Sequence, residues 1–240
     1  MNQHTILAII PARGGSKGIK GKNIVNCAGK PLLYWTAKSA HESSLIGKCI
    51  LSSDDENIIK KAQELNIKTP FIRPKYLAED DTPSLFVVKH ALKWVLENNY
   101  YNPDIVVLLQ PTSPLRTSRH IDEAIQLLIN DSEADSVVSV VKVPHNYSVD
   151  SIMCEKDGYL IPWKAQNEVK NIRQLKKEFV ARNGAAIYAF RTKTLLEQNS
   201  IYGKKIIPYL MSQEESVDVD TAFELKICEM LLSQKIESKK

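Results

Sequence analysis

Short runs rich in apolar residues alternate with amphipathic segments along the first two thirds of the chain. The apolar runs fall at residues 5–10, 49–53, 105–109 and 136–141. Runs of this length, bounded by turn residues, are typical of strands buried on both faces of a parallel sheet. Helical spacing of apolar positions occurs in between, at residues 31–40, 55–65, 84–97 and 120–130. This alternation predicts an α/β fold with a doubly wound, mostly parallel sheet.

The alternation breaks down between about residues 144 and 182. Pro144, Gly158 and Pro162 interrupt this stretch, and a mixed-charge segment covers residues 168–178. We interpret it as a hairpin or arm that leaves the main sheet. The pattern then returns with a core strand at residues 185–190 and a last helix at residues 221–234. We therefore expect one domain, residues 1–240, with an inserted arm at about 144–182.

The arm carries two large aromatic residues, Tyr159 and Trp163. Left exposed, such side chains would create an apolar patch that is unusual on a monomer. We therefore expect the arm to pack against a second copy of the chain in a homodimer.

Composition restricts the class of protein without naming a function. The chain has 240 residues, of which 43% are hydrophobic and 25% charged, as in ordinary globular proteins. No stretch approaches the roughly 18 consecutive apolar residues of a membrane span, and the first apolar run is too short for the core of a signal peptide. We expect a cytoplasmic protein without a membrane partner.

Charge and cysteine usage agree with that expectation. Cys27, Cys49, Cys154 and Cys228 are far apart and form no CxxC pair, which argues for reduced thiols and against a zinc site. The net charge of +4 is mild, and the basic residues are dispersed. This balance suits a small anionic substrate, and we expect no nucleic-acid partner.

A glycine-rich basic loop, residues 11–23, follows the first predicted strand directly. Its glycines allow backbone N–H groups to approach an anion closely, and they are Gly14, Gly15, Gly18 and Gly21. Its basic residues add four positive charges, and they are Arg13, Lys17, Lys20 and Lys22. Amide donors together with mobile cations are what a triphosphate requires. The loop matches neither the Walker A motif nor the GxGxxG fingerprint, and the alternative is a flexible basic surface turn.

Four segments of the chain carry a family resemblance that extends over nearly its whole length. They are PARGGSKGIKGKN (11–23), RPKYLAEDDTPS (73–84), LLQPTSPLR (108–116) and VDVDTA (217–222). The first closely resembles the signature loop of the acylneuraminate cytidylyltransferases, the CMP-sialic acid synthetases. The resemblance implies a nucleotide-diphospho-sugar transferase fold, a homodimer and CTP as the nucleotide.

Nucleotide contacts carry over from the first two segments. By resemblance they are Arg13, Ser16, Lys17, Lys22 and Asn23 in the loop, with Gly14 supplying its backbone, and Arg73 and Ser84 in the second segment. Taken alone, Arg73 would be part of a charged turn and Ser84 a helix cap.

Sugar contacts are expected after the strand at residues 105–109. Gln110 can donate and accept hydrogen bonds, which suits a sugar hydroxyl or amide. Arg116 could bind a carboxylate or support the loop, and the alternative is that it is part of a rigid turn bracketed by prolines. Arg173 and Asn183 resemble the RQ and NGA segments of the family. Arg182 is displaced by one residue from the arginine of the family.

Asp218 and Asp220 flank Val219, so in an extended segment both carboxylates face the same side. Two carboxylates plus phosphate oxygens and water suit Mg²⁺, the expected cofactor. The alternative is that both are acidic residues at a helix N-terminus. With a triphosphate site implied, the metal role is favoured.

The implied reaction is attack of the anomeric hydroxyl of a nine-carbon 2-keto sugar acid on the α-phosphorus of CTP, with release of pyrophosphate. Arg13, Lys17, Asp218 and Asp220 are the expected catalytic residues. Candidate sugars are N-acetylneuraminic, legionaminic and pseudaminic acids. The alternatives are a related transferase that uses Kdo or another nucleotide, and a nucleotide- or RNA-binding protein without catalysis.

Overall fold

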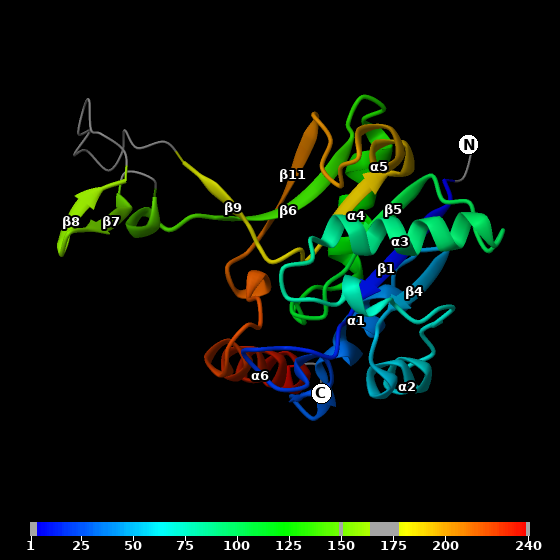
Figure 1. Ribbon diagram of the computed structural model, residues 1–240. Helices are drawn as coiled ribbons and strands as arrows, with labels where there is room; N and C mark the ends of the chain where they lie inside the picture. Colours follow the sequence, from blue (N-terminus) through cyan, green and yellow to red (C-terminus); the bar gives the residue numbers. More distant parts are fainter. Residues whose placement is uncertain (1–3, 149–150, 164–177, 239–240) are drawn as a thin grey trace.

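A seven-stranded sheet forms the centre of the protein in the computed structural model, which describes residues 4–148, 151–163 and 178–238. The strand order is β11-β6-β10-β5-β1-β4, and β9 also pairs with β6 (Figure 1). The strands are β1 (Ile6–Pro11), β4 (Lys48–Ser52), β5 (Ile105–Leu108), β6 (Ser136–Lys142), β9 (Val180–Arg182), β10 (Tyr188–Arg191) and β11 (Ile206–Met211).

Five of these strands run in one direction. β1 pairs parallel with β4 and β5, and β6 pairs parallel with β11, whereas β10 is antiparallel to both β5 and β6. The sheet is therefore mixed but mostly parallel, as expected. β9 and β10 run the other way because the chain returns through them from the arm, without the crossover helix that a parallel connection needs.

Helices cover both faces of the sheet. α1 (Leu32–His41), α2 (Glu56–Glu64) and α4 (Ser118–Asn130) share one core with Ile6, Ala8 and Ile10 of β1. α3 (Ser84–Glu97) and α5 (Thr192–Gln198) share the other core with Leu7 and Ile9. Successive residues of β1 therefore point to opposite faces of the sheet. Because both faces are covered by helices, every position of the strand is apolar.

The last helix, α6 (Ala222–Glu237), belongs to a third apolar cluster below the sheet, with Cys27, Trp35 and Leu115. A short ladder of β2 (Asn26–Cys27) and β3 (Lys30–Pro31) adjoins it. Within the described residues no helix combines the length and the apolar character needed to cross a membrane.

Helix boundaries agree with the sequence-based expectations to within two residues for α1 to α4. α4 begins before His120 because the Thr117 side chain accepts a hydrogen bond from the His120 N–H and so caps the helix. α5 and β11 were not predicted. β11 contains Pro208, which argues against a central strand, and it lies at the edge of the sheet where proline is tolerated.

The described part of the predicted arm contains a projecting hairpin (Figure 1). β7 (Met153–Lys156) and β8 (Tyr159–Pro162) pair antiparallel around Asp157 and Gly158, which both have positive φ. Figure 1 shows this hairpin far from the body of the domain, beyond β6 and β9. Residues 164–177 of the predicted arm lie outside the described residues.

Candidate active site

A cavity of about 610 Å³ lies at the carboxyl edge of the sheet, beside the ends of β1 and β5. Ten of the site residues expected from the sequence line it, although they come from four distant segments. They are Arg13, Ser16, Lys17, Lys22, Asn23, Arg73, Ser84, Gln110, Asp218 and Asp220. Ligands of open α/β sheets bind at this edge, so the location fits the expectation.

Hydrogen bonds between backbone groups of the basic loop and nearby side chains fix the loop at the cavity. The Asn23 side-chain amide donates to the Arg13 carbonyl at 2.9 Å, and the Gly14 N–H donates to Asp54 at 3.1 Å. Gly14 does not itself line the cavity; a Cβ there would stand 2.6 Å from the Asp55 carboxylate. The glycine therefore allows the loop to pack against the start of α2.

The two expected phosphate ligands of the loop are paired with a carboxylate. Arg13 Nη1 lies 2.6 Å from Asp80 Oδ1, and Lys17 Nζ lies 2.5 Å from Asp80 Oδ2. Lys17, and then Arg13, lower the pKa of Asp80 below its ordinary value. Asp80 is therefore ionised at neutral pH and neutralises part of the positive charge of the loop.

Arg73 forms the buried floor of the cavity. Its Nε donates to Ser52 Oγ at 3.0 Å, Nη2 donates to the Ser52 carbonyl, and Nη1 donates to the Leu77 carbonyl at 3.5 Å. Burial is the main reason that the pKa of Arg73 is lowered to about 10. Ser84 also lines the cavity; it is the first residue of α3 and makes no side-chain cap, so its hydroxyl does not serve the helix end.

Asp218 and Asp220 line the same cavity. Val219 between them is fully buried, and its N–H donates to the Thr112 carbonyl at 2.8 Å. Asp220 pairs with Lys22 at 2.8 Å. Thr221 and Glu224 form the capping box of α6, so neither aspartate caps the helix.

Asp218 is in an unusual environment for a carboxylate. Its Oδ1 is buried and has no hydrogen-bond partner within the described part of the chain. Burial is the main reason that the pKa of Asp218 is raised to about 6, against an opposing hydrogen bond from the Thr112 side chain and with a further contribution from the charge of Asp220. A buried ionised oxygen without a donor is costly unless a cation satisfies it, which is what a metal ligand requires.

Two glycines allow other segments to approach these aspartates. A Cβ on Gly18 would stand 2.2 Å from the Asp220 carbonyl, and a Cβ on Gly184 would stand 2.1 Å from Asp218 Oδ2. Gly184 also has a φ of +68°, which favours glycine. Gly18 of the basic loop therefore packs against the backbone of Asp220, and Gly184 packs against the carboxylate of Asp218.

We expect the Gly184→Ala variant to lose about ten- to a hundredfold in turnover, because the new methyl group would displace the Asp218 carboxylate from its position. Gly29→Ala is the matched control, since Gly29 has a φ of +78° and open space around its Cβ position. Both variants should lose some stability from backbone strain. Equal turnover of the two in a steady-state assay would show that Asp218 does not need its observed position.

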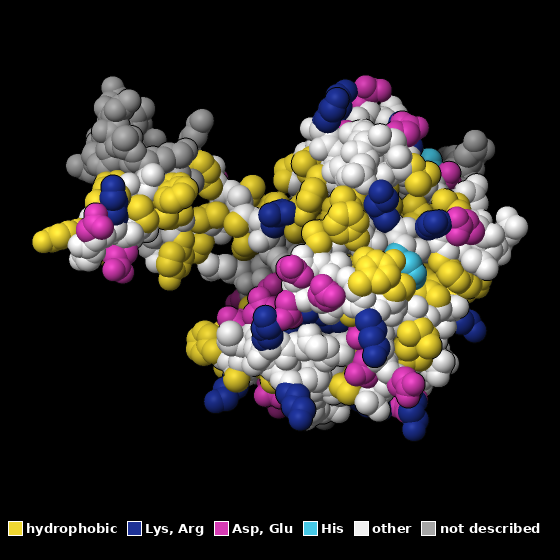
Figure 2. Space-filling view, viewed as in Figure 1, with side chains coloured by type: hydrophobic (Ala, Val, Ile, Leu, Met, Phe, Trp, Pro, Cys, Tyr) yellow, Lys and Arg dark blue, Asp and Glu magenta, His cyan; other side chains and the backbone are white. Residues whose placement is uncertain are grey.

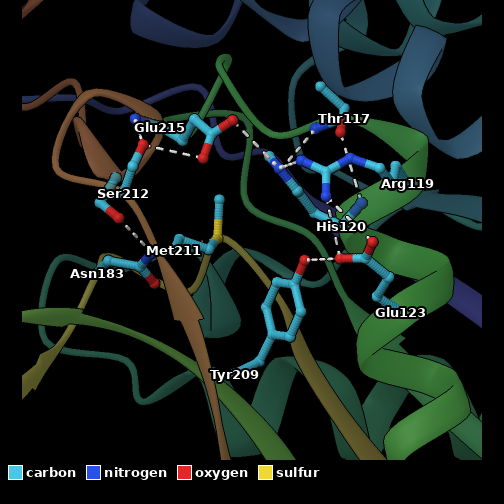
Figure 3. A network of polar contacts seen from close by, with 10 residues as sticks. Thr117, Arg119, His120, Glu123, Asn183, Tyr209, Met211, Ser212 and Glu215 are labelled. Carbon is cyan, nitrogen blue, oxygen red and sulfur yellow. Dashed lines mark hydrogen bonds and ion pairs between the residues drawn. The ribbon is translucent and has the colours of Figure 1, made fainter.

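A network of polar contacts holds the segment that precedes Asp218 (Figure 3). His120 Nε2 lies 3.2 Å from Glu215 Oε1, and Asn183 Nδ2 donates to Ser216 Oγ at 2.9 Å. His120 is buried, and burial is the main reason that its pKa lies below the ordinary value. The neighbouring 3₁₀ turn, Glu214–Ser216, is thereby fixed to the start of α4 and to the end of β9.

Asn183 was expected to contact the sugar, and the structure places it elsewhere. Its side chain is buried, accepts from Ser139 Oγ at 2.6 Å and does not line the cavity. β9 and β10 pair with the same side of β6, and Asn183 lies in the break between them, where strand pairing is interrupted. Its amide donates to Ser216 and so stabilises the segment that leads to Asp218.

Arg116 is likewise removed from the cavity. The buried guanidinium donates to the Ala186 carbonyl at 2.7 Å, to Thr36 Oγ1 at 2.6 Å and to the Gln110 carbonyl at 3.2 Å. Burial lowers its pKa to about 9. Of the two roles considered for Arg116, the structure favours support of the Gln110 loop over binding of a carboxylate.

The family resemblance also concerns Arg173 and Arg182. Arg173 lies outside the described residues, and Arg182 does not line the cavity. Arg182 on β9 stands over the ring of Tyr202, 5.3 Å from its centroid, and donates to the Tyr202 hydroxyl.

Comparison with known proteins gives the identity of the family. A family model described as "Cytidylyltransferase" matches residues 7–231 of the chain. The chain belongs to this cytidylyltransferase family. The resemblance drawn from the four sequence segments is thereby confirmed.

Among its relatives, the cytidylyltransferase is 31% identical over 98% of its length to an N-acylneuraminate cytidylyltransferase of Escherichia coli O18:K1:H7. It spans only 54% of that relative. It is 28% identical over 97% of its length to the pseudaminic acid cytidylyltransferase of Campylobacter jejuni, and covers 98% of that protein.

The fold of the cytidylyltransferase is similar to the solved structure of a CMP:2-keto-3-deoxy-manno-octonic acid synthetase complexed with CTP. The TM-score is 0.72 over 96% of this chain and 99% of the other, at 16% sequence identity. At this identity the likeness establishes the α/β fold with its mixed, mostly parallel sheet.

Sequence reasoning did not assign several residues of the cavity. They are Pro11, Gly18, Leu77, Glu79, Asp80, Thr82, Val87, Pro111 and Thr112. All of them except Val87 lie within one of the four matching segments, and Asp80 lies in the 73–84 segment. Its proximity to Arg13 and Lys17 depends on the folding of two loops and carries no sequence signal.

Proposed function

We propose that this member of the cytidylyltransferase family transfers CMP from CTP to a nine-carbon 2-keto sugar acid, with release of pyrophosphate. One observation supports it above all: a single cavity combines the basic glycine-rich loop with the carboxylates of Asp218 and Asp220. Relatives named for N-acylneuraminate and for pseudaminic acid favour a sugar acid of this class.

The residues of the basic loop would bind the triphosphate. Arg13 and Lys17 line the cavity and both pair with Asp80, so their charged groups could meet the β- and γ-phosphates there. Phosphoryl transfer depends chiefly on position and charge neutralisation, and these two side chains would stabilise the negative charge of the leaving pyrophosphate.

The carboxylate pair fits Mg²⁺. Asp218 supplies a buried oxygen with no hydrogen-bond partner, and Asp220 supplies a second carboxylate that now pairs with Lys22. Among the described residues no group of three or more ligating side chains is gathered, so phosphate oxygens and water must complete the shell. When bound, the ion would neutralise phosphate charge and lower the pKa of the attacking hydroxyl.

Gln110 and Thr112 follow β5 at the centre of the cavity edge. Their side chains are in contact, with Thr112 Oγ1 donating to Gln110 Oε1 at 3.5 Å. The lining residues include no histidine or cysteine, so an imidazole or thiol base is absent from the described wall. Gln110 would then orient the sugar through hydrogen bonds, without removing its proton.

Pyrophosphate release tests the proposal, with CTP, UTP, GTP and ATP each offered together with N-acetylneuraminic, legionaminic or pseudaminic acid and Mg²⁺. We expect turnover with CTP and one nine-carbon acid. Equal or faster turnover with another nucleotide would refute the cytidylyl assignment. Kdo is included because the solved structure of similar fold is named for that eight-carbon acid; preference for Kdo would refute the nine-carbon assignment.

We also propose that the hairpin arm joins two copies of the chain. Tyr159, Leu160 and Trp163 are 76%, 72% and 65% exposed. Figure 2 shows hydrophobic side chains gathered on this hairpin, away from the body of the domain. An exposed apolar surface of this kind usually marks a protein interface.

The Leu160→Asp variant should therefore weaken the dimer by about tenfold or more, as expected for a charge placed in an apolar contact. Leu196→Asp is the control, because Leu196 is a similarly exposed leucine on α5. Sedimentation equilibrium at micromolar concentration measures the effect. A fully active wild-type monomer would contradict the proposed dimer.

A cytoplasmic location remains part of the proposal. Cys27, Cys49, Cys154 and Cys228 are all free thiols, as expected in a reducing compartment.

A further inference from the structure

The carboxylate of Asp80 stands where an anionic ligand of the basic loop would stand. Each of its two oxygens contacts a different cation, Arg13 at 2.6 Å and Lys17 at 2.5 Å. Arg13 Nη1 also donates to the Ala78 carbonyl at 3.4 Å, so the loop is tied to residues 78–80 by two kinds of contact. A bridging carboxylate with an oxygen on each cation occupies the same donors that a phosphate group would use.

Asp80 lies in a short connecting segment, and its side chain is partly exposed. It lies between the 3₁₀ turn Lys75–Leu77 and the start of α3. The side chains of Asp80 and Lys17 are 38% and 83% exposed, so water screens the pair. Exposed ion pairs of this kind contribute little to stability, and a more highly charged ligand can replace them.

From these contacts we propose that Asp80 is an internal counter-ion of the phosphate-binding cations, which the triphosphate of the nucleotide displaces. The proposal rests on the proposed function, because it takes the ligand of the loop to be a nucleotide. Before binding, Asp80 keeps Arg13 and Lys17 extended across the cavity and shields them from other anions. On binding, Arg13 and Lys17 transfer to phosphate oxygens, and Asp80 turns toward solvent.

A direct consequence is competition between Asp80 and the nucleotide. The Asp80→Asn variant keeps the size of the side chain and removes its charge, so Arg13 and Lys17 are no longer neutralised in the free protein. We expect CTP to bind this variant about three- to tenfold more tightly, since two exposed ion pairs no longer have to be broken. The apparent KM for CTP should fall by a similar factor.

Asp81→Asn is the matched control. It removes the same charge from the next residue, which is exposed and makes no ion pair within the described ranges. Calorimetric titration with CTP is compared for wild type, Asp80→Asn, Asp81→Asn, Lys17→Ala and the Lys17→Ala/Asp80→Asn double variant. The gain from Asp80→Asn should shrink in the Lys17→Ala background, because one of the two competing contacts is already absent.

Two results would overturn the counter-ion role. Weaker binding by Asp80→Asn would mean that Asp80 holds the cations in a position that the nucleotide needs. Equal gains in Asp80→Asn and Asp81→Asn would mean a general change in charge near the cavity, without competition for the two cations.

Titration with inorganic tripolyphosphate separates this proposal from the proposed function. It carries the phosphate chain without base or sugar, so the competition should persist with it. If tripolyphosphate shows the gain while CTP is not preferred over the other nucleotides, the counter-ion role stands and the cytidylyl assignment fails. If CTP is preferred and Asp80→Asn binds neither CTP nor tripolyphosphate more tightly, the cytidylyl assignment stands and the counter-ion role fails.

Discussion

Turnover should fall by about a hundredfold or more when Asp218 or Asp220 is replaced by asparagine, while folding and CTP binding are retained. The metal that these carboxylates would hold contributes several kcal/mol of charge stabilisation, and each 1.4 kcal/mol or so corresponds to about a factor of ten in rate. Asparagine keeps the shape of the side chain and removes its charge. Steady-state kinetics at saturating CTP and Mg²⁺ measure the loss.

The two variants should differ in stability, which separates the metal role from a structural one. The pKa of Asp218 is raised from 3.8 to about 6 in the folded protein, mainly by burial. The folded state therefore binds more protons than the unfolded state between these values, and stability falls as pH rises from about 4 to about 6.

Above that range the ionised Asp218 carboxylate remains destabilising. Asp218→Asn should therefore raise the free energy of unfolding at pH 7 by about 1 to 3 kcal/mol, and change it little near pH 3. Asp220 is exposed and paired with Lys22, so Asp220→Asn should change stability by less than about 1 kcal/mol. Thermal melts at both pH values test this, with Asp81→Asn as the control for loss of one charge. Near-normal activity of both variants would show that the metal is held elsewhere.

Arg13→Ala and Lys17→Ala should each reduce turnover by roughly 30- to 1,000-fold, with little loss of stability. Contacts to the negative charge that develops on the leaving group are worth about 2 to 4 kcal/mol in catalysis. Both side chains are partly or largely exposed, so neither contributes much to folding.

Lys20→Ala is the control for this pair. Lys20 is an exposed lysine of the same loop that does not line the cavity. Its loss should change turnover by less than about threefold, because only screened long-range charge is removed. Wild-type rates in Arg13→Ala and Lys17→Ala, or equal losses in all three variants, would contradict specific phosphate contacts.

The sequence predicts those elements of the fold in which the spacing of apolar residues is typical of a single kind of secondary structure. β1 has an apolar residue at every position, and α3 has helical spacing from Ser84 to Glu97, so both were placed within a residue of their observed bounds. The reversed direction of β10 could not be foreseen, because an apolar run does not encode the direction of its strand. β11 was missed because Pro208 argues against a strand unless its edge position is known.

The candidate site also contains residues that the sequence could place and residues that it could not. Residues of the basic loop and the Asp218–Asp220 pair could be placed together, because both lie in segments that resemble one family and the basic loop directly follows a buried strand. Asn183 and Arg116 could not be placed, because a polar residue in a loop segment has the same sequence signal whether it faces a ligand or a buried carbonyl. Burial decides between the two, and burial depends on the whole fold.

We propose that this cavity transfers the α-phosphorus of CTP to an acidic sugar. ³¹P nuclear magnetic resonance follows it directly, with the purified protein, CTP, Mg²⁺ and the preferred 2-keto sugar acid. Our account predicts that the three CTP signals are replaced by pyrophosphate and one phosphodiester signal in equal molar amounts, from pyrophosphate and the CMP-sugar. Formation of CDP with inorganic phosphate, of CMP without a sugar conjugate, or no change in the CTP signals would contradict it.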